Sequence, residues 1–218
     1  MALLKFENVS YAVNNRYILK NIYLEVNHRD FISVVGPSGS GKSTFFRLCS
    51  QLVSPTNGNI FYKNMPYTKY GPIEWRRQIA YCFQTPSLFG DTVMDNLKFP
   101  FFIRNKKLDL SMIKELLKNF KMSSEYLSRS IDNLSGGEKQ RIALIRALIF
   151  NPEILLLDEV TSALDEKNTL IVEDVIKSLN DSGTTILWIT HNSEQSKKYA
   201  NKILSIENGK FNSLEVIK

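Results

Sequence analysis

The run GPSGSGKST, residues 36–44, constrains the fold of this chain more than any other feature. It fits the pattern G-x-x-x-x-G-K-[ST]. It lies between an apolar run that predicts a strand, 31–35, and a helix predicted from Lys42 to about Leu52. Glycines in such a loop let the backbone curl until its N–H groups face phosphate oxygens. A strand, a glycine-rich loop and a helix in this order therefore predict a nucleotide-phosphate site.

The side chains of this loop suit the same purpose. Lys42 is expected to neutralise charge on the β- and γ-phosphates, and the hydroxyl of Ser43 is expected to bind Mg²⁺. We therefore expect ATP to contact the whole loop, which consists of Gly36, Pro37, Ser38, Gly39, Ser40, Gly41, Lys42, Ser43 and Thr44.

Polar residues follow three other apolar runs. The run ILLLDE predicts a buried strand that delivers Asp158 to the carboxyl edge of the sheet, where it can hold Mg²⁺ through water. Glu159 is then placed to orient and deprotonate the attacking water. Gln84 and His191 each follow a further predicted strand, so both are expected near the γ-phosphate. The alternatives without a catalytic role are a solvated turn for Asp158 and Glu159 and purely structural roles for Gln84 and His191.

A second glycine-rich turn, LSGGEKQR at 134–141, opens onto another helix. Ser135 is a good N-cap residue, and Glu138 three residues later completes a capping box. The free N–H groups and the dipole at such a helix start form an anion site. One domain thus carries two anion sites, and the second needs an explanation.

Strand-like and helical runs alternate along the chain, which indicates an α/β fold with a largely parallel sheet. Residues 2–26 predict an antiparallel β region, and a helical stretch at 86–150 interrupts the sheet. We expect one domain over residues 1–218. It divides into a nucleotide-binding core with the β region, 1–84 and 151–218, and a helical subdomain, 85–150. Other predicted elements are strands at 79–83, 154–157 and 185–189 and helices at 111–120 and 168–179.

Composition and charge limit the binding partners and the cellular location that the chain can be expected to have. The chain has 218 residues and a net charge of +6, but its basic residues are scattered, with short patches at 104–107 and 197–198. A solvated surface fits them better than a nucleic-acid site, and an anionic membrane face is the next candidate. No apolar run approaches the ~18–20 residues of a membrane-spanning helix, and the start does not read as a signal peptide. Cys49 and Cys82 form no metal motif and are expected to be buried. A cytoplasmic protein is the expectation.

Taken together, these motifs resemble the nucleotide-binding domain of the ABC ATPases over essentially the whole chain. The resemblance implies a P-loop NTPase (RecA-like) core with ATP and Mg²⁺ as cofactors. The order of motifs is the same: the phosphate loop 36–44, Gln84, the signature LSGGE at 134–138, the acidic strand 154–159, the SALD run 162–165 and His191.

The same resemblance explains the second anion site. In this family two domains pair head to tail, and each ATP lies between the phosphate loop of one and the signature of the other. Ser135, Gly136 and Gly137 would then serve the nucleotide of a partner domain. The simplest partner is a second copy of this chain, which gives a homodimer on ATP binding.

Further roles are implied by the resemblance alone. Tyr11 matches the aromatic residue that stacks on adenine, although it is also an ordinary strand residue. Gln84 and Asp158 would contact Mg²⁺ together with Ser43, and His191 would hold the γ-phosphate. The dimer seam would include Ser162 and Asp165 of the SALD run.

The segment 84–106 is richer in aromatic residues than a generic loop of this kind. In the family this region receives a helix from the membrane subunit, so an apolar groove is expected there, with packing inside the helical subdomain as the alternative. Its candidate residues are Leu88, Phe89, Phe99, Phe101 and Phe102.

Within the family, the chain looks most like the ATPase subunit of the bacterial Fet-type system, which is linked to iron export. That match rests on the segment around Gln84 and on the runs LSGGEKQRIALIRAL and LLLDEVTSALDE. Two departures from the family are Arg29-Asp30 in place of Gly-Glu, which should alter a turn, and Asn192 in place of Asp after His191.

The leading hypothesis is therefore an ATPase subunit that drives a separate membrane-spanning subunit from the cytoplasmic face of the membrane. A soluble ABC ATPase acting on ribosomes or DNA is the alternative. Such proteins typically carry two domains in one chain or a long coiled-coil insertion, and this sequence has neither. A non-catalytic nucleotide sensor is disfavoured because Glu159 and His191 are present.

Overall fold

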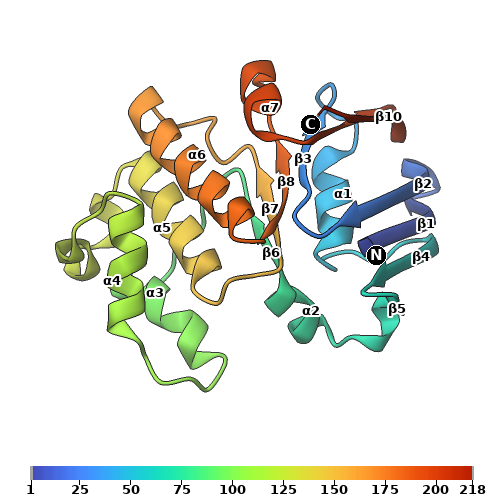
Figure 1. Ribbon diagram of the computed structural model, residues 1–218. Helices are drawn as coiled ribbons and strands as arrows, with labels where there is room; N and C mark the ends of the chain where they lie inside the picture. The colour runs from blue at the N-terminus through green and yellow to red at the C-terminus, as the bar shows by residue number, and fades with distance from the viewer. Residues whose placement is uncertain (1, 218) are drawn as a thin grey trace.

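The computed structural model describes residues 2–217, which form two sheets with helices between and beside them (Figure 1). The larger sheet has six strands in the order β10-β9-β3-β8-β7-β6, and every neighbouring pair is parallel except β10 with β9. Its strands are β3 (Phe31–Val35), β6 (Ile79–Cys82), β7 (Ile154–Asp158), β8 (Thr185–Ile189), β9 (Lys202–Glu207) and β10 (Lys210–Val216).

The smaller sheet is antiparallel and has the order β2-β1-β4-β5. The predicted antiparallel region near the N-terminus is confirmed, since β1 and β2 form a long hairpin that turns at Asn14 and Asn15, both with positive φ. Its strands are β1 (Ala2–Val13), β2 (Arg16–Asn27), β4 (Asn57–Tyr62) and β5 (Met65–Pro66).

Seven α-helices occur within residues 2–217. In Figure 1, α1 lies between the two sheets, while α5 and α6 cover the other face of the parallel sheet and α3 and α4 lie beyond them. The helices are α1 (Lys42–Cys49), α2 (Pro72–Gln78), α3 (Val93–Phe102), α4 (Leu110–Asn119), α5 (Gly136–Leu148), α6 (Glu166–Asp181) and α7 (Ser193–Tyr199).

The parallel sheet separates two apolar cores. On β7, Ile154 and Leu156 pack into the core shared with α1 and the antiparallel sheet, whereas Leu155 and Leu157 pack into the core shared with α5 and α6. Successive side chains of a strand point to opposite faces, so a strand covered on both sides needs a continuous apolar run. This confirms the α/β fold with a mostly parallel sheet.

Several predicted boundaries are corrected. The helix expected to reach Leu52 ends at Cys49, because Gln51 takes a left-handed φ of 57° and the N–H of Leu52 turns back to the carbonyl oxygen of Arg47. The helix expected at 168–179 runs from Glu166 to Asp181. The stretch 86–150 is not continuously helical, since long loops separate α3, α4 and α5.

The unusual pair Arg29-Asp30 forms the turn between β2 and β3. Arg29 takes the left-handed φ of 64° that glycine adopts most easily, and its N–H donates to the hydroxyl of Thr185. Asp30 is buried and accepts hydrogen bonds from the N–H of Asn27 and from Lys202 Nζ, both at 2.7 Å. The departure therefore lies in a turn, in which Arg29 takes the φ that a glycine would adopt.

Within residues 2–217, no helix is both long and apolar enough to cross a bilayer. Cys49 and Cys82 are free and buried, as predicted.

Candidate nucleotide site

The loop between β3 and α1 has the tight backbone that its glycines predict. Gly36, Gly39 and Gly41 have φ values of 144°, 76° and 107°, a region that side chains rarely tolerate. A Cβ atom on Gly36 would lie 2.1 Å from the carbonyl oxygen of Ile206, and one on Gly41 would lie 2.8 Å from Leu19. The loop is therefore held against β9 and β2, and only glycine fits at these two contacts.

Lys42 folds back over this loop. Its Nζ donates to the carbonyl oxygens of Gly36 at 2.8 Å and Pro37 at 2.9 Å. Burial lowers the pKa of Lys42, and the nearby charges of Glu159 and Asp158 oppose that shift. The ammonium group thus lies on the phosphate loop, near the acidic residues at the end of β7, Asp158 and Glu159.

The start of α1 completes an anion cradle. Gly41 is the N-cap residue and supplies no side-chain hydrogen bond, so the first N–H groups of the helix stay available to a ligand. Ser38 and Ser43 are exposed, Thr44 is half-buried, and Ser40 is buried with a hydroxyl that has no hydrogen-bond partner.

Three neighbouring strands bring Gln84, Glu159 and His191 together, because β6, β7 and β8 lie side by side and end at the same edge (Figure 1). Gln84 Nε2 donates to Glu159 Oε2 at 2.7 Å, and His191 Nε2 lies 2.8 Å from Glu159 Oε1. Each carboxylate oxygen of Glu159 is therefore engaged by a side chain from a different strand end.

The backbone at Glu159 is also unusual. Its φ is 49°, a left-handed conformation that is uncommon for a glutamate, and its N–H donates to the carbonyl oxygen of Ile189 on β8. Such backbone conformations gather at functional sites, where surrounding structure holds them in place. The hydrogen bond to β8 supplies that support here.

Asp158 ends β7 and is 6% exposed. Its Oδ2 accepts a hydrogen bond from the hydroxyl of Tyr81 at 2.7 Å. Burial and this carboxylate raise the pKa of Tyr81, which keeps the hydroxyl a donor. Tyr81 was not among the sequence candidates, because a tyrosine within a strand reads as an ordinary core residue until its partner on the next strand is known.

The signature turn carries the predicted capping box. Ser135 Oγ accepts the N–H of Glu138, and a carboxylate oxygen of Glu138 accepts the N–H of Ser135 at 2.8 Å. Burial alone would raise the pKa of Glu138, but hydrogen bonds from Tyr126 and Ser135 lower it overall. The carboxylate therefore stays charged and holds the start of α5.

The two anion sites of the chain lie apart. Phe45 of α1 packs in one core and Ile142 of α5 in the other, so the two helices lie on opposite faces of the parallel sheet (Figure 1). Within residues 2–217, no hydrogen bond or ion pair joins Ser135, Gly136 or Gly137 to the loop 36–44.

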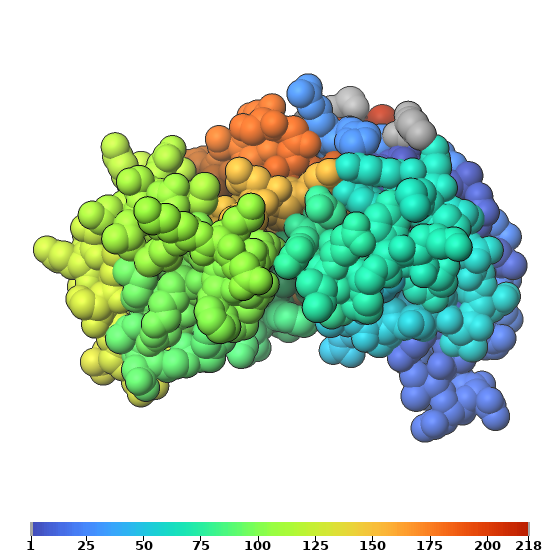
Figure 2. All heavy atoms as spheres, turned by 90° about the horizontal axis from the view of Figure 1, so that it is seen from below, coloured from blue at the N-terminus to red at the C-terminus, as the bar shows by residue number. Residues whose placement is uncertain are grey.

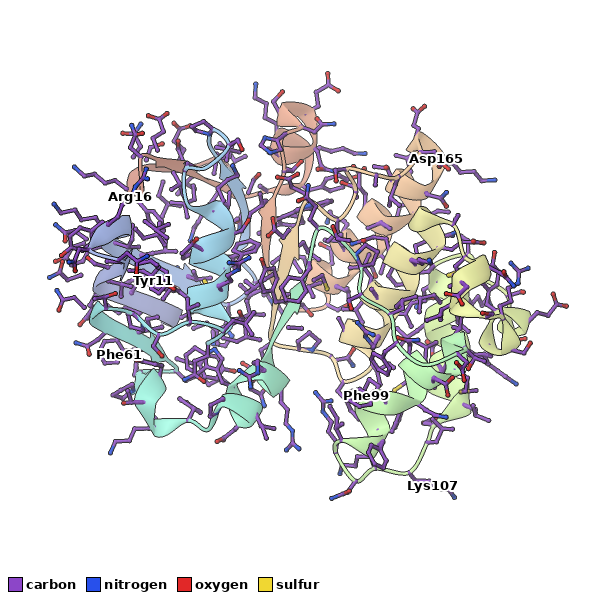
Figure 3. The ribbon with its side chains drawn as sticks, turned by 180° about the vertical axis from the view of Figure 1, so that it is seen from behind. Tyr11, Arg16, Phe61, Phe99, Lys107 and Asp165 are labelled. Atoms are coloured by element: carbon purple, nitrogen blue, oxygen red, sulfur yellow. The ribbon has the colours of Figure 1, made fainter. Side chains whose placement is uncertain are left out.

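The remaining sequence candidates lie near these two sites. Tyr11 on β1 pairs with Leu19, the residue that touches Gly41, and it is half-buried against the first core (Figure 3). Ser162 Oγ donates to the carbonyl oxygen of Glu159 at 2.8 Å. Asp165 caps α6, and its hydrogen bond from the N–H of Asn168 is the main cause of its lowered pKa.

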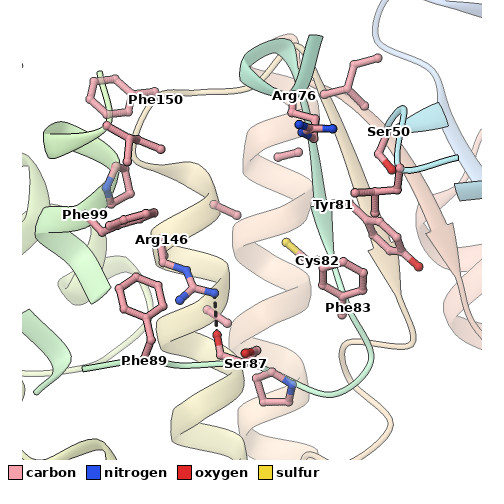
Figure 4. A pocket seen from close by; sticks show the side chains of 18 of the residues that line it. Ser50, Arg76, Tyr81, Cys82, Phe83, Ser87, Phe89, Phe99, Arg146 and Phe150 are labelled. Atoms are coloured by element: carbon pink, nitrogen blue, oxygen red, sulfur yellow. Dashed lines mark hydrogen bonds between the residues drawn. The ribbon is translucent and has the colours of Figure 1, made fainter. Parts of the chain in front are cut away.

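A cavity of about 420 Å³ is lined by residues of β6, α3 and α5 (Figure 4). Phe89, Phe99 and Phe150 line one wall, and Arg146 crosses it to donate to the carbonyl oxygen of Ser87 at 2.7 Å. Viewed from below, the molecule is hollowed between the green segment of α3 and the teal segment around α2 (Figure 2).

The candidate residues of the predicted apolar groove differ in their surroundings. Phe89 and Phe99 lie on it, whereas Phe101 is 4% exposed and packs against Phe150 with ring centres 5.0 Å apart. Leu88 packs against the second core, and Phe102 points to solvent at 76% exposure. Phe101 nevertheless lines a second pocket of about 640 Å³ together with Phe89, Phe99 and Phe102, and Leu88 is only partly buried, so the groove stays a prediction for these residues.

The fold and the site define a P-loop ATPase, and comparison with known proteins identifies its family. The ABC transporter family model matches residues 19–162. The chain therefore belongs to the ABC transporter family and is an ATP-binding cassette, an ATPase coupled to transport.

Individual relatives span nearly the full chain. The probable iron export ATP-binding protein FetA of Escherichia coli (strain K12) is 41% identical over 206 residues, 94% of this chain and 91% of that protein. The arginine transport ATP-binding protein ArtM of Bacillus subtilis (strain 168) is 35% identical over 216 residues, 95% of this chain and 88% of that protein. An ATP-binding cassette solved as a dimer in a post-hydrolysis state with ADP and Pi has a TM-score of 0.88 at 29% identity, with 99% of each chain covered.

Proposed function

We propose that this chain hydrolyses ATP at Glu159 and drives a separate membrane-spanning subunit, with metal export, iron in particular, as the transport reaction. The observation that carries the proposal is the pair of contacts that Gln84 and His191 make with the two carboxylate oxygens of Glu159. A carboxylate held in this way at a sheet edge beside Lys42 suits a general base that orients one water molecule.

Lys42 has a direct role in this proposal. In the structure, Lys42 Nζ donates to two neutral carbonyl oxygens of its own loop. Phosphate oxygens carry full charge and form stronger, charge-assisted hydrogen bonds, so the ammonium group is expected to turn to the β- and γ-phosphates of ATP. The free N–H groups of the loop would surround the same phosphates. Tyr11, one strand away from Leu19, would then stack on the adenine ring.

The residues near Glu159 also suit Mg²⁺. Ser43, Asp158 and Gln84 offer hydroxyl, carboxylate and amide oxygens, the donors that this hard cation prefers. Because Gln84 gives its amide nitrogen to Glu159, its amide oxygen is the atom left for the metal. When bound, Mg²⁺ would neutralise charge on the β- and γ-phosphate oxygens.

We infer that a second copy completes the site. Ser135 and Gly136 are exposed at the start of α5, on the other face of the sheet from the phosphate loop. The first N–H groups of a helix and its dipole suit the γ-phosphate of a facing molecule. The solved relative described above is also a dimer with nucleotide. Gly137 would join this contact, and Ser162 and Asp165 would lie along the seam.

The cavity beside α3 would receive the membrane subunit. Its aromatic wall of Phe89, Phe99 and Phe150 suits an apolar helix, and the protein would then lie on the cytoplasmic face of the membrane as a peripheral subunit. Gln84 belongs to the loop that leads from β6 to α3, and the cavity runs beside this loop. A partner bound in the cavity would therefore be connected to the hydrolytic site by a short stretch of chain.

Iron export is the finer part of the proposal, and similarity to the Escherichia coli protein supports it. Cassettes named for arginine transport and for spermidine and putrescine import are 34–35% identical to this chain, so one cassette fold serves different cargoes. The cargo must therefore be tested on the assembled transporter.

The test uses inverted membrane vesicles that contain this chain and the membrane protein encoded beside it. With the cassette outside, an exporter should accumulate Fe²⁺ inside the vesicles when Mg·ATP is added. Glu159→Gln should bind ATP but abolish accumulation, because it removes the base. ATP hydrolysis without Fe²⁺ accumulation would contradict the iron assignment, and an absence of hydrolysis would contradict the enzymatic proposal itself.

A further inference from the structure

A cluster of buried polar side chains lies behind His191, outside the residues assigned above to ATP. Gln195 of α7, Glu173 of α6 and Thr190 after β8 are 5%, 6% and 7% exposed. Thr161, two residues past Glu159, joins them from the loop between β7 and α6. Buried polar groups destabilise a fold unless they are hydrogen-bonded, so their partners indicate what the cluster holds in place.

Gln195 is the centre of this cluster. Its Oε1 accepts the hydroxyl hydrogen of Thr190, and its Nε2 donates to Glu173 Oε1 at 2.7 Å and to Thr161 Oγ1 at 3.3 Å. Both N–H groups and the oxygen of the amide are therefore used, which leaves it a single orientation. The other oxygen of Glu173 accepts the hydroxyl of Tyr199 at 2.7 Å.

The hydrogen bonds of Gln195 enclose the residue between Thr190 and Asn192. Thr190 Oγ1 accepts the N–H of Asn192 at 3.1 Å while it donates to Gln195, so one hydroxyl ties together the backbone on both sides of His191. His191 in turn contacts Glu159, and the chain from Glu159 leads to Thr161, which Gln195 also holds. These contacts form a closed ring that includes both site residues.

We propose that Gln195 is a positioning residue for His191. It fixes the loop that carries His191 against the loop that follows Glu159, and Glu173 is its buried anchor. Close packing alone would not require this arrangement, because an apolar side chain of the same size would fill the space without hydrogen bonds. Gln195 acts only through His191, so the inference rests on the role in hydrolysis proposed above for that residue.

The test uses the fact that the chain has two histidines, His28 and His191. The Cε1–H groups of their rings therefore give two NMR signals, and His28, in the turn after β2, is an internal reference. Gln195→Leu should shift the His191 signal and leave that of His28 in place. It should also lower kcat about tenfold or more, with KM for ATP within about twofold, because small misplacements of catalytic groups are costly.

Tyr199→Phe is the matched control. It also removes a hydrogen bond to Glu173, but Gln195 keeps all of its partners, so the His191 signal and kcat should stay as in the wild type. A Gln195→Leu protein that is folded but leaves the His191 signal unmoved would overturn the proposal. So would a Tyr199→Phe protein that moves this signal as far.

A charge exchange keeps the proposal testable if Gln195→Leu fails to fold. Gln195→Glu sets two carboxylates side by side and should displace the His191 signal or prevent folding. The double variant Gln195→Glu with Glu173→Gln restores one amide and one carboxylate, so it should recover both the His191 signal and kcat. A folded double variant whose His191 signal stays displaced would overturn the inference. An absence of ATP hydrolysis in the wild type would instead contradict the proposed function, because the NMR prediction does not depend on turnover.

Discussion

The side chain and the backbone of Glu159 both form hydrogen bonds within the site. Its side chain meets Gln84 and His191, its N–H is bonded to β8, and its carbonyl oxygen accepts the hydroxyl of Ser162. A carboxylate so restrained can present one oxygen to a water molecule in a defined direction, which is what general-base catalysis requires. Positive charge to neutralise the phosphates must come from another residue, and Lys42 of the phosphate loop offers it.

Lys42→Ala should therefore abolish ATP hydrolysis, because it removes the positive charge that neutralises the β- and γ-phosphates. The measurement is phosphate release at saturating Mg·ATP, with a thermal melt to establish that the variant is folded. Lys69→Ala, at an exposed lysine in the turn before α2, is the control and should hydrolyse ATP normally. Turnover near the wild-type rate in Lys42→Ala would remove the basis of the phosphate site.

Asp30 allows a stability prediction, since it is buried and forms an ion pair with Lys202, whose side chain is 14% exposed. Asp30→Asn should lower the free energy of unfolding by about 2 kcal/mol, because it leaves the partly buried ammonium group of Lys202 without its counter-charge. Asp181→Asn makes the same chemical change in the exposed pair with Lys177 and should cost less than about 1 kcal/mol. Equal losses in urea unfolding would show that burial of the Asp30 pair has no special weight.

At the scale of elements, the strands of the two sheets differ in how well they can be read from the sequence. The runs 154–157 of β7 and 186–189 of β8 are apolar because both faces are covered, so they were predictable. β4 and β9 were missed. β4 contains Asn57, Gly58 and Asn59, and these residues read as a turn until the pairing with β1 is known. β9 buries only Leu204 and Ile206, with Ser205 and Glu207 between and after them, which is too short an apolar pattern to mark a strand.

The residues of the site also differ in how well they could be predicted from the sequence. The phosphate loop, the capping box of Ser135 and Glu138, and the strand-end positions of Gln84 and His191 follow from local patterns. The hydrogen bond from Tyr81 to Asp158 and the amide ring of Gln195 depend on side chains that only tertiary packing brings together. No local signal in the sequence marks such residues.

The start of α5 gives the prediction at this scale. Glu138→Ala should lower the free energy of unfolding by about 1 kcal/mol, since it removes the acceptor for the N–H of Ser135 and for the hydroxyl of Tyr126. Glu138→Gln keeps an acceptor oxygen and should lose less. Chemical unfolding of the two variants makes the comparison, and a Glu138→Ala protein as stable as the wild type would mean that the capping box adds nothing.

At the scale of the whole molecule, the hydrolytic edge and the cavity beside α3 lie apart. Phe99 and Lys107 lie toward one end of the helical part and Asp165 toward the other (Figure 3). The loop with Gln84 leads from β6, beside the cavity, to α3. This arrangement suits a subunit that hydrolyses ATP at one face and passes movement to a partner at another.

Phe99→Asp should prevent association with the membrane subunit while ATP binding is retained, because it places a charge in an aromatic wall. The measurement is co-purification of the two subunits from detergent extract. Tyr17→Asp makes a similar change at an exposed aromatic residue of the β1–β2 hairpin and should leave the complex intact. A complex that survives Phe99→Asp would place the membrane subunit on another surface.

The central claim is that Ser135 serves the nucleotide of a second copy, and a disulfide tests it directly because it requires Cα atoms within about 7 Å. Cysteines are introduced at Ser38 and Ser135 in the Glu159→Gln background, which keeps ATP bound. The natural thiols should stay inert, since burial raises the pKa of Cys49 and raises that of Cys82 to about 12.

With Mg·ATP and an oxidant, the head-to-tail model predicts a covalent dimer on a non-reducing gel. It also predicts efficient heterodimers when the Ser38→Cys and Ser135→Cys proteins are mixed, and few dimers from either protein alone. A monomer that runs faster, bridged internally between its own two loops, with no dimer at any ATP concentration, would contradict the account.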